Sequence, residues 1–346
     1  MKALLATNIG EVSMQEIPTP ECGDDDVLIK VEYAGICGSD MHIYHGTHPF
    51  RKPPVILGHE LSGVIIRKGV KVDSLNIGDE VTAMPVVSCG ECIWCKKDMP
   101  VHCAKLRVPG TSGWVGTFVE YFNIPARWVY KKPDNIDLKT AVLAEPLSVA
   151  IHALRKFQGN EKENLLIIGV GAIGSLAVVA AKAMGFGRIM VSDVSEFNLD
   201  LALKSGADRA VNVLRESLED AVVETFGMEP FGKDKASAVL VTADHENVLL
   251  DAVHCLGIEK RVVTISTITT PRPFVVTDLT EKLGRISGSA SFGREDFELA
   301  LRLMGENAEV FASIVSHVFP KEKAQEAFEI IDQKKEGISK AVIKMS

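Results

Sequence analysis

Four cysteines in one short stretch of the chain have the spacing to bind a single metal ion. They lie in the row Cys-Gly-Glu-Cys-Ile-Trp-Cys, which is completed after seven further residues by a fourth: Cys89, Cys92, Cys95 and Cys103. Thiolates hold zinc tightly, and a shell of four leaves no position for a substrate. We therefore expect a structural zinc lobe over about residues 86–106. A disulfide-bonded loop is the alternative, which we disfavour because the first residues look like a strand and not like a secretory signal.

A second set of possible ligands is spread over the first 145 positions. Cys37 lies in Gly-Ile-Cys-Gly-Ser-Asp, His59 and Glu60 in Gly-His-Glu, and Glu145 in Ala-Glu-Pro. Taken singly, a cysteine is most often a small core residue, and a glutamate in a first helical turn is a favourable end charge. Together they offer a thiolate, an imidazole and one or two carboxylates, which suits a catalytic zinc with an open position. Spacing alone does not decide between these interpretations.

A glycine-rich loop follows the apolar run 165–168 and precedes a helical pattern. Its fingerprint is Gly169-Val-Gly171-Ala172-Ile173-Gly174. In this context the glycines permit a tight turn, a close approach of a pyrophosphate and close helix packing, and the helix N-terminus attracts phosphate. Asp193, at the end of the next expected strand, can accept hydrogen bonds from ribose hydroxyls and would repel a 2′-phosphate. No Arg or Lys occurs over 194–203, so we expect NAD rather than NADP. The alternative to a nucleotide site is a plain glycine turn with an Asp that caps a helix.

Length and composition limit the classes of function. The 346 residues are enough for about two domains, and 46% hydrophobic with 24% charged residues is an ordinary globular balance. The net charge of −8 offers no basic surface for nucleic acid, and no apolar run approaches a membrane span. Seven cysteines, with four committed to zinc, favour a reducing cytoplasm, and Cys22 and Cys255 have no assigned role.

The pattern of the chain changes near residue 148. Before it, short apolar runs with turn residues predict strands at 27–34, 61–67 and 118–124. After it, strands alternate with helices, which predicts an α/β fold with a parallel, doubly wound sheet. We expect strands at 165–168, 188–193, 238–241 and 261–265 and helices at 172–184, 197–204, 295–304 and 321–332. A final strand, 340–344, is expected to return to the first domain.

In combination, these blocks resemble the zinc-dependent medium-chain dehydrogenases over essentially the whole chain. The stretches His42–Phe50 and Pro85–Cys89 are similar to those of the polyol and sugar-acid branch, in particular bacterial L-gulonate and L-galactonate 5-dehydrogenases. The resemblance implies a GroES-like catalytic domain over 1–147 and 289–346 and a Rossmann NAD-binding domain over 148–288. It also implies two zinc ions per chain and a homodimer or homotetramer.

The resemblance also assigns roles to single residues. Cys37, His59 and Glu145 would hold the catalytic zinc, with Glu60 as a second-shell or exchangeable ligand. Ser39 would contact the substrate hydroxyl, His42 would pass its proton toward solvent, and Asp40 would orient the site. Zinc would acidify the substrate alcohol while NAD accepts hydride.

Several positions depart from the family pattern and leave the substrate open. Asn198, Thr242-Ala243-Asp244, Ser266 and Ala290 stand where relatives often carry other residues. A sugar acid would need a cation, and the candidates are Arg51, His45, His48, Lys52 and Arg294, although each is more commonly a solvated surface group. Tyr44, Phe50 and Trp114 are candidates for an apolar wall or for ordinary packing.

Three functions follow from these observations. The leading hypothesis is oxidation of a secondary alcohol of a polyol or hexonate, with L-gulonate or L-galactonate at the fifth carbon as the specific expectation. L-threonine 3-dehydrogenase or another zinc alcohol dehydrogenase is the second. A non-enzymatic zinc protein that binds nucleic acid is a remote third, which the negative net charge disfavours.

Overall fold

The computed structural model describes residues 1–97, 99–111, 113–157, 162–228, 238–333 and 337–346. The chain divides into two units. Unit 1 comprises Met1–Glu145 and Phe292–Ser346, and unit 2 comprises Pro146–Ser291. The sequence had suggested divisions after residues 147 and 288. Because unit 1 is built from two separated segments, its second segment must return to strands that the first segment formed.

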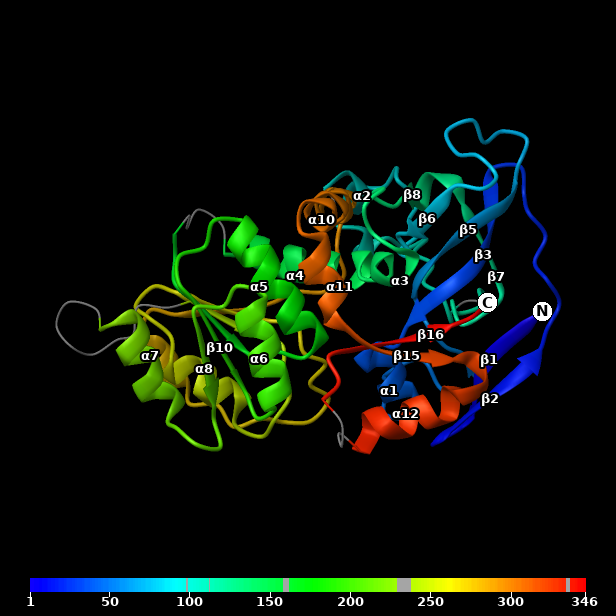
Figure 1. Ribbon diagram of the computed structural model, residues 1–346. Coiled ribbons are helices and arrows are strands. Elements are labelled where there is room, and N and C mark those ends of the chain that lie inside the picture. Colours follow the sequence, from blue (N-terminus) through cyan, green and yellow to red (C-terminus); the bar gives the residue numbers. More distant parts are fainter. Residues whose placement is uncertain (98, 112, 158–161, 229–237, 334–336) are drawn as a thin grey trace. The chain divides into compact units, whose positions relative to one another are not determined.

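Two sheets make up the β structure of the described part of unit 1 (Figure 1). The smaller has the order β2-β1-β4, and the larger has the order β15-β16-β3-β5-β6-β8, with β7 paired to β3. The strands of the first segment are β1 Lys2–Asn8, β2 Glu11–Glu16, β3 Asp26–Gly35, β4 Val55–Ile56, β5 Glu60–Lys68, β6 Glu80–Ala83, β7 Tyr121–Pro125 and β8 Val129–Lys131. The second segment adds β15 Val315–Pro320 and β16 Lys340–Lys344.

The long strand β3 organises the site, because it has a partner on each side. Its neighbour β5 runs antiparallel and places Glu60 opposite Gly35. On its other side β16 also runs antiparallel, with Val342 opposite Gly35. Val27, Leu28, Ile29 and Val31 are buried and anchor β3 in the core. The predicted return of the last strand to the first domain is therefore confirmed.

Helices complete unit 1, and the first of them follows directly after Cys37. They are α1 Gly38–Tyr44, α2 Ile93–Lys96, α3 Leu138–Ala141, α10 Arg294–Glu306, α11 Ala308–Ile314 and α12 Ala324–Gln333, with 3₁₀ turns at η1 Pro100–His102, η2 Ala126–Trp128 and η3 Lys321–Lys323. Helix α4, Ala144–Arg155, begins in unit 1 and continues into unit 2.

Unit 2 contains a six-stranded parallel sheet with the order β11-β10-β9-β12-β13-β14. This order, which starts from the middle and proceeds outward in both directions, is the doubly wound arrangement of dinucleotide-binding folds. The strands are β9 Leu165–Ile168, β10 Ile189–Asp193, β11 Arg209–Asn212, β12 Ala238–Val241, β13 Arg261–Thr264 and β14 Arg285–Gly288. The helices are α5 Ala172–Ala183, α6 Glu196–Lys204, α7 Leu218–Phe226, α8 Val248–His254 and α9 Val276–Glu281.

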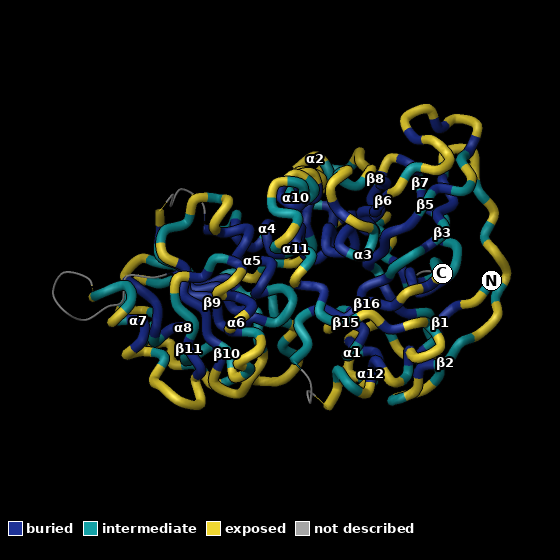
Figure 2. Tube along the Cα trace, viewed as in Figure 1, coloured by how far each residue is buried: buried dark blue, intermediate teal, exposed yellow. Residues whose placement is uncertain are grey.

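The core of unit 2 lies between its sheet and its helices. All four residues of β9 are buried, as are all four of β12, which explains why their sequences are continuous apolar runs (Figure 2). Helices α5 and α6 pack against each other, and α8 packs against both α7 and α9. The predicted α/β class with a doubly wound sheet is confirmed.

Two of the predicted elements differ in their bounds. The strand expected over 118–124 starts only at Tyr121, because Phe118 donates its N–H to Leu57 and Val119 pairs with Ala3. The helix expected from Lys321 starts as a 3₁₀ turn and becomes α-helical at Ala324. The short strands β11 and β14 were not predicted. Within the described residues, no helix combines the length and apolar character needed to cross a bilayer.

Candidate metal centre and coenzyme loop

Cys37, His59 and Glu60 come together at the ends of β3 and β5. One ligand atom from each residue can be chosen so that all three atoms lie within 4.8 Å of one another. Cys37 precedes α1 as its N-cap, and Glu60 is the first residue of β5. The antiparallel register that sets Gly35 against Glu60 therefore places two distant sequence blocks beside each other. A thiolate, an imidazole and a carboxylate form a suitable ligand set for a catalytic zinc.

The carboxylate of Asp40 fastens the two ligand-bearing segments to each other. One oxygen accepts the backbone N–H of Cys37 at 3.0 Å, and the other accepts the backbone N–H of Gly58 at 3.0 Å. The Asp40 side chain is fully buried. Because one rigid group bonds to the backbone of Cys37 and to that of Gly58, the neighbour of His59, it fixes the separation of these two ligands. This geometry agrees with the orienting role that was expected of Asp40.

Glu60 is held by a cation from the far end of the sequence. Lys340 donates from Nζ to Glu60 Oε1 at 2.5 Å and to the Ile36 carbonyl oxygen at 2.9 Å. Both side chains of the pair are inaccessible to solvent, with 2% of Lys340 and 0% of Glu60 exposed. Gly35 leaves room for this carboxylate, since a Cβ at position 35 would lie 1.8 Å from Glu60 Oε2.

Two atoms of the cluster lack hydrogen-bond partners, as expected where a metal belongs. His59 Nδ1 and Glu60 Oε2 are both buried and unpaired. Burial by itself lowers the pKa of His59, but the Cys37 thiolate, Glu145 and Asp40 outweigh it and raise this pKa to about 10. The negative charge around His59 favours a cation bound at this cluster. The residues present therefore fit a divalent zinc ion.

Glu145 lies near this cluster but outside it. The three ligand atoms that group together in the described residues are those of Cys37, His59 and Glu60, and Glu145 is not part of this group. Glu145 is buried at the start of α4, and burial raises its pKa to about 7, with His59 and Lys340 opposing this shift. Its carboxylate also contributes to the raised pKa of His59.

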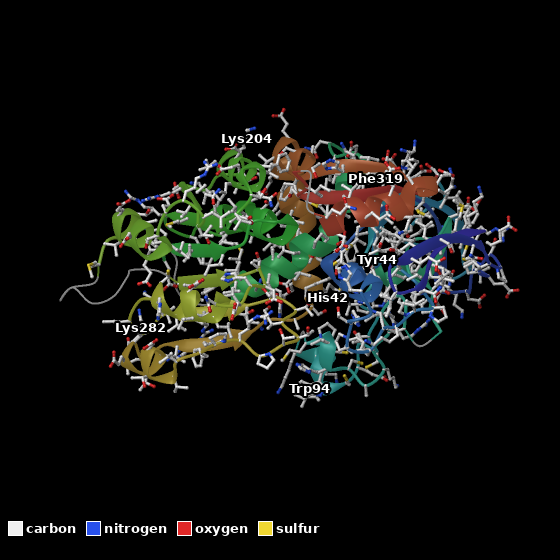
Figure 3. The ribbon with its side chains drawn as sticks, turned by 90° about the horizontal axis from the view of Figure 1, so that it is seen from below. His42, Tyr44, Trp94, Lys204, Lys282 and Phe319 are labelled. Carbon is white, nitrogen blue, oxygen red and sulfur yellow. The ribbon has the colours of Figure 1, made fainter. Side chains whose placement is uncertain are left out.

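The two residues expected to carry the substrate proton lie on α1. Ser39 is in the first turn, two residues beyond Cys37, and receives a hydrogen bond from Arg51 Nη2 at 3.4 Å. His42 is one turn further along (Figure 3), and its Nδ1 lies 3.1 Å from Thr47 Oγ1. No hydrogen bond joins Ser39 directly to His42 among the described side chains, so a bridging hydroxyl or water would be needed to connect them.

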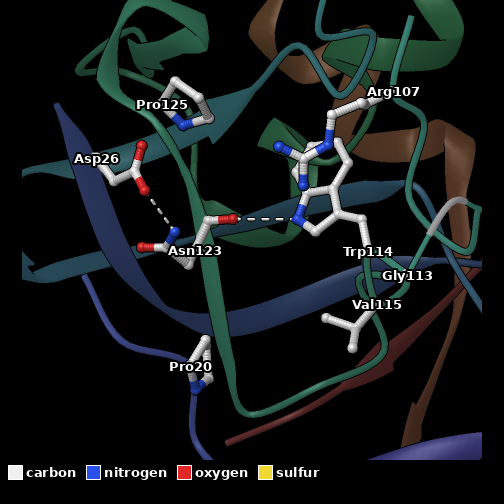
Figure 4. Close-up of a pocket in the computed structure, with 8 residues that line it drawn as sticks. All are labelled: Pro20, Asp26, Arg107, Gly113, Trp114, Val115, Asn123 and Pro125. Atoms are coloured by element: carbon white, nitrogen blue, oxygen red, sulfur yellow. Dashed lines mark hydrogen bonds between the residues drawn. The ribbon is translucent and has the colours of Figure 1, made fainter. Parts of the chain in front are cut away.

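The expected aromatic wall is dispersed. Tyr44 is buried against Phe328, whereas Phe50 is 78% exposed and meets His48 edge-on. Trp114 stacks on Phe122 and carries the Arg107 guanidinium over its ring. Trp114 lines a pocket of about 200 Å³ at the beginning of β3 (Figure 4), together with Pro20, Asp26, Arg107, Gly113, Val115, Asn123 and Pro125. Asp26 is the first residue of β3, whereas Cys37 lies two residues beyond its last, so this pocket is separate from the zinc cluster.

The four cysteines of the predicted structural lobe are gathered as expected. Their sulfur atoms all lie within 4.8 Å of one another, and every cysteine of the chain is free of disulfide bonds. Backbone N–H groups of Glu91 and Cys92 lower the pKa of Cys89 to about 6. A thiol that ionises this readily is prepared for metal binding. The prediction of a structural zinc site is therefore confirmed, and the disulfide alternative is wrong.

The glycine loop of unit 2 has the features of a phosphate-binding turn. Gly169 has φ +91°, and a Cβ on Gly174 would lie 2.1 Å from the Gly169 carbonyl oxygen. Around Gly171, which caps α5, a Cβ would meet nothing within 4 Å. The first and third glycines are therefore required by the turn and by helix packing. The second leaves space at the helix N-terminus, where Ala172 and Ile173 follow.

Asp193 is already tied to the glycine loop. Its Oδ2 accepts the N–H of Val170, and its Oδ1 accepts the N–H groups of Val194 and Ser195. A carboxylate has about four lone-pair sites, so roughly one remains for a ribose hydroxyl without rearrangement. Thr242, which was noted only as a departure from the family pattern, donates to the Gly169 carbonyl oxygen at 2.6 Å and supports the same turn.

Lys340 was not predicted as a site residue. The available signal was a lysine at the start of the buried run Ala-Val-Ile, where a charged side chain must find a partner.

The cations considered as partners for a sugar-acid carboxylate differ in their surroundings. His45 pairs with Asp332, Lys52 is exposed, and Arg294 bonds to Tyr130.

Comparison with known proteins agrees with these sites. Residues 23–134 match the alcohol dehydrogenase GroES-like domain, and residues 172–306 match the zinc-binding dehydrogenase family. A sorbitol dehydrogenase of Bombyx mori is 31% identical over 335 residues, which is 92% of each chain. An L-threonine 3-dehydrogenase of Marinomonas sp. (strain MWYL1) is 39% identical over 64% of this chain and 68% of that protein.

A solved structure extends the likeness to the whole fold. An alcohol dehydrogenase from Escherichia coli CFT073 in complex with NADH has a TM-score of 0.87 and 28% identity, with 99% of each chain covered. The full-length similarity, the two metal clusters and the doubly wound sheet all agree. The chain belongs to the zinc-dependent medium-chain dehydrogenases, which are NAD(P)-dependent oxidoreductases of alcohols and polyols.

Proposed function

We propose that this protein transfers hydride from a secondary alcohol of a polyol or sugar acid to NAD, with L-gulonate or L-galactonate at the fifth carbon as the preferred substrate. The cluster of Cys37, His59 and Glu60, with two buried atoms that lack partners, is the observation that supports this proposal most directly. The similarity to a sorbitol dehydrogenase supports a polyhydroxy substrate.

The residues of unit 1 have different roles in the proposed reaction. When bound, zinc acts as a Lewis acid that lowers the pKa of the substrate alcohol, and NAD serves as the hydride acceptor. Cys37, His59 and Glu60 would hold the metal, and Glu145 would offer a further carboxylate nearby. Asp40 and Lys340 keep these ligands in place through the hydrogen bonds described above.

Proton removal is assigned to the side chains of α1. Ser39 accepts the proton of the substrate hydroxyl, and His42 delivers it to solvent. The exposed Thr47, whose Oγ1 lies 3.1 Å from His42 Nδ1, provides the outer end of this path. A bridging hydroxyl or water between Ser39 and His42 completes it.

A substrate screen tests the proposed reaction. Zinc-replete protein is incubated with NAD and hexonates, hexitols, their phosphates or L-threonine, and NADH formation is followed by its near-ultraviolet absorbance. We expect the highest kcat/KM with hexonates. The variant His59→Ala should lose turnover while NAD binding, measured by fluorescence, is kept. Retained activity in His59→Ala would remove zinc from the reaction.

The preference for NAD over NADP rests on Asp193. Its carboxylate would repel a 2′-phosphate, and no Lys or Arg lies over residues 194–203 to attract one. We expect Asp193→Ala to weaken NADH binding and to relax discrimination against NADPH. The exposed Asp200→Asn is the matched control, and an unchanged coenzyme preference in Asp193→Ala would mean that Asp193 is not the ribose partner.

L-Threonine 3-dehydrogenase activity is the second candidate. The 39% identity to the Marinomonas protein favours it, although the matched region covers only 64% of this chain. Activity restricted to L-threonine or to simple alcohols in the same screen would reject the sugar-acid proposal in favour of this one.

We further propose a homodimer that pairs unit 2 sheets along β14. This strand is bonded only to β13 within the described sheet, and its residues Arg285, Ile286 and Gly288 are exposed. An unpaired, exposed edge strand is a ready template for a second copy of the chain. Light scattering coupled to size exclusion should give a dimer or tetramer, and Ile286→Pro should shift it toward the monomer.

A further inference from the structure

Arg51 places a guanidinium group directly beside the hydroxyl of Ser39. Its Nη2 lies 3.4 Å from Ser39 Oγ, and its Nη1 lies 3.5 Å from the Pro109 carbonyl oxygen. Its Nε and Nη2 also approach His48 Nε2, at 3.2 and 3.1 Å. The side chain is therefore positioned by Ser39, Pro109 and His48, and one edge of the guanidinium faces Ser39, two residues after Cys37.

This guanidinium is half-buried and has no anionic partner. Within the described ranges, no carboxylate lies within ion-pair distance of Arg51, whereas Lys260, Lys321 and Lys340 each have one. A cation that is partly withdrawn from water is normally paired, because its desolvation otherwise goes uncompensated. The positive charge of Arg51 is thus available to a ligand.

His48 does not supply the missing negative charge. Burial lowers the pKa of His48 to about 4, and the neighbouring Arg51 charge adds to this effect, so the ring is neutral at physiological pH. Its Nδ1 also faces the backbone N–H groups of Phe50 and Arg51, at 3.3 and 3.0 Å. A neutral imidazole has a single acceptor nitrogen, so it cannot serve both these amides and the guanidinium. Either the two backbone N–H groups or the guanidinium therefore needs another acceptor.

The geometry points to an anion subsite at Arg51, next to Ser39 and the zinc cluster, that binds the carboxylate of the substrate while Ser39 remains free for the reacting hydroxyl. This inference rests on the proposed function and specifies its substrate as an anionic sugar derivative. The planar fork of a guanidinium matches a carboxylate or a phosphate, whereas a neutral polyol offers it only hydroxyl oxygens. The other candidate cations are less suitable, because His45 is paired with Asp332 and Lys52 donates to the Gly46 carbonyl oxygen in exposed surroundings.

The test measures discrimination between matched substrates. Zinc-replete wild type, Arg51→Gln, Arg51→Lys and Lys52→Gln are assayed with a hexonate, the corresponding hexitol and its terminal phosphate. Lys52→Gln removes the same charge one position away and is the matched control. We expect the ratio of kcat/KM for the hexonate to that for the hexitol to fall roughly 10- to 100-fold in Arg51→Gln, to fall less in Arg51→Lys, and to stay unchanged in Lys52→Gln.

Different results identify the anion or overturn the subsite. A preference for the hexitol phosphate that is lost in Arg51→Gln would support the subsite and assign it to phosphate. Equal losses for hexonate and hexitol in Arg51→Gln, or a wild type that prefers the neutral hexitol, would overturn it.

A binding measurement separates this inference from the proposed reaction. Calorimetric titration of the hexonate into wild type and Arg51→Gln needs no turnover. If no alcohol is oxidised by the zinc-replete wild type, the proposed function fails. The calorimetric comparison then still decides whether Arg51 binds the anion, because equal hexonate affinity in the two proteins would contradict the subsite.

Discussion

The ammonium group of Lys340 lies 2.5 Å from a carboxylate oxygen of Glu60, although 280 positions separate the two residues in the chain. The contact exists because β16 returns to pair with β3, whose other neighbour β5 begins at Glu60. Neither side chain reaches solvent. Each charge therefore depends on the other for compensation, and Glu60 is held with one oxygen on Lys340 and the other left for a metal.

Lys340→Met tests this dependence. Removing one partner of a buried ion pair leaves an uncompensated charge, which costs about 3–5 kcal/mol. We expect the thermal midpoint of the zinc-replete protein to fall by roughly 5–15 °C. Lys344→Met, on the exposed side of the same strand, should change it little. Equal midpoints for Lys340→Met and the wild type, measured by calorimetry, would contradict the role of the pair.

Gly35→Ala should displace the Glu60 carboxylate. A Cβ at this position would lie 1.8 Å from Glu60 Oε2 and 2.9 Å from Val142 Cγ1, and Lys340 prevents Glu60 from moving away freely. We expect lowered zinc affinity and a loss of roughly 1–3 kcal/mol from overpacking. The control is Gly38→Ala, where a Cβ meets nothing within 4 Å. Both are checked by thermal melting and by zinc analysis after dialysis.

Asp40→Asn should loosen the metal centre without removing a ligand. The carboxylate accepts one backbone N–H on each oxygen, whereas an amide has only one acceptor oxygen and turns its NH₂ group toward the other N–H. We expect zinc affinity to fall roughly 10- to 100-fold, the usual effect of losing a residue that orients metal ligands. Competition with a chromophoric chelator gives the measurement. The exposed Asp73→Asn should match the wild type, and an Asp40→Asn protein of wild-type affinity would disprove the role.

His48 should make the stability of the protein depend on pH. Burial, together with Arg51, lowers its pKa from 6.5 to about 4, so the unfolded chain takes up a proton more readily than the folded protein between these values. The stability contributed by neutral His48 is complete above pH 6.5 and is lost as the pH falls toward 4. Between pH 7 and 5 the wild type should lose about 2 kcal/mol more than His48→Gln.

This difference corresponds to roughly 4–8 °C in the thermal midpoint. The two proteins are melted in parallel at several pH values, so that effects of other titrating groups cancel. Curves of midpoint against pH that run parallel for the two proteins would show that His48 does not carry the effect.

The parts of the site that depend on residue type could be predicted from the sequence. The four cysteines, Cys37 and His59 carry donor atoms that proteins use for zinc, and their local blocks are distinctive. The parallel sheet was predictable because runs such as 165–168 are apolar on both faces of a strand. The remote alternative of a non-enzymatic zinc protein is not supported, since the chain belongs to a family of enzymes.

The parts that depend on register could not be predicted. The pairing of Gly35 with Glu60, which sets Glu60 beside Cys37, follows from how β3 and β5 align, although Glu60 itself had been expected as a possible ligand. The contact of Lys340 with Glu60 requires a further strand from the second segment of unit 1. The contact of Arg51 with Ser39 depends on the path of the loop between them, which carries no periodic pattern.

The order of synthesis follows from the discontinuity of unit 1. A ribosome translates Glu60 early, then the whole of the 146–291 segment, and only afterwards Lys340. Domains fold as units during translation. All residues of unit 2 are therefore synthesised before Lys340, the partner of Glu60 in unit 1. Until the closing strand has emerged, Glu60 lacks the cation that holds its carboxylate in the finished protein, although Cys37, His59 and Glu60 all belong to the first segment.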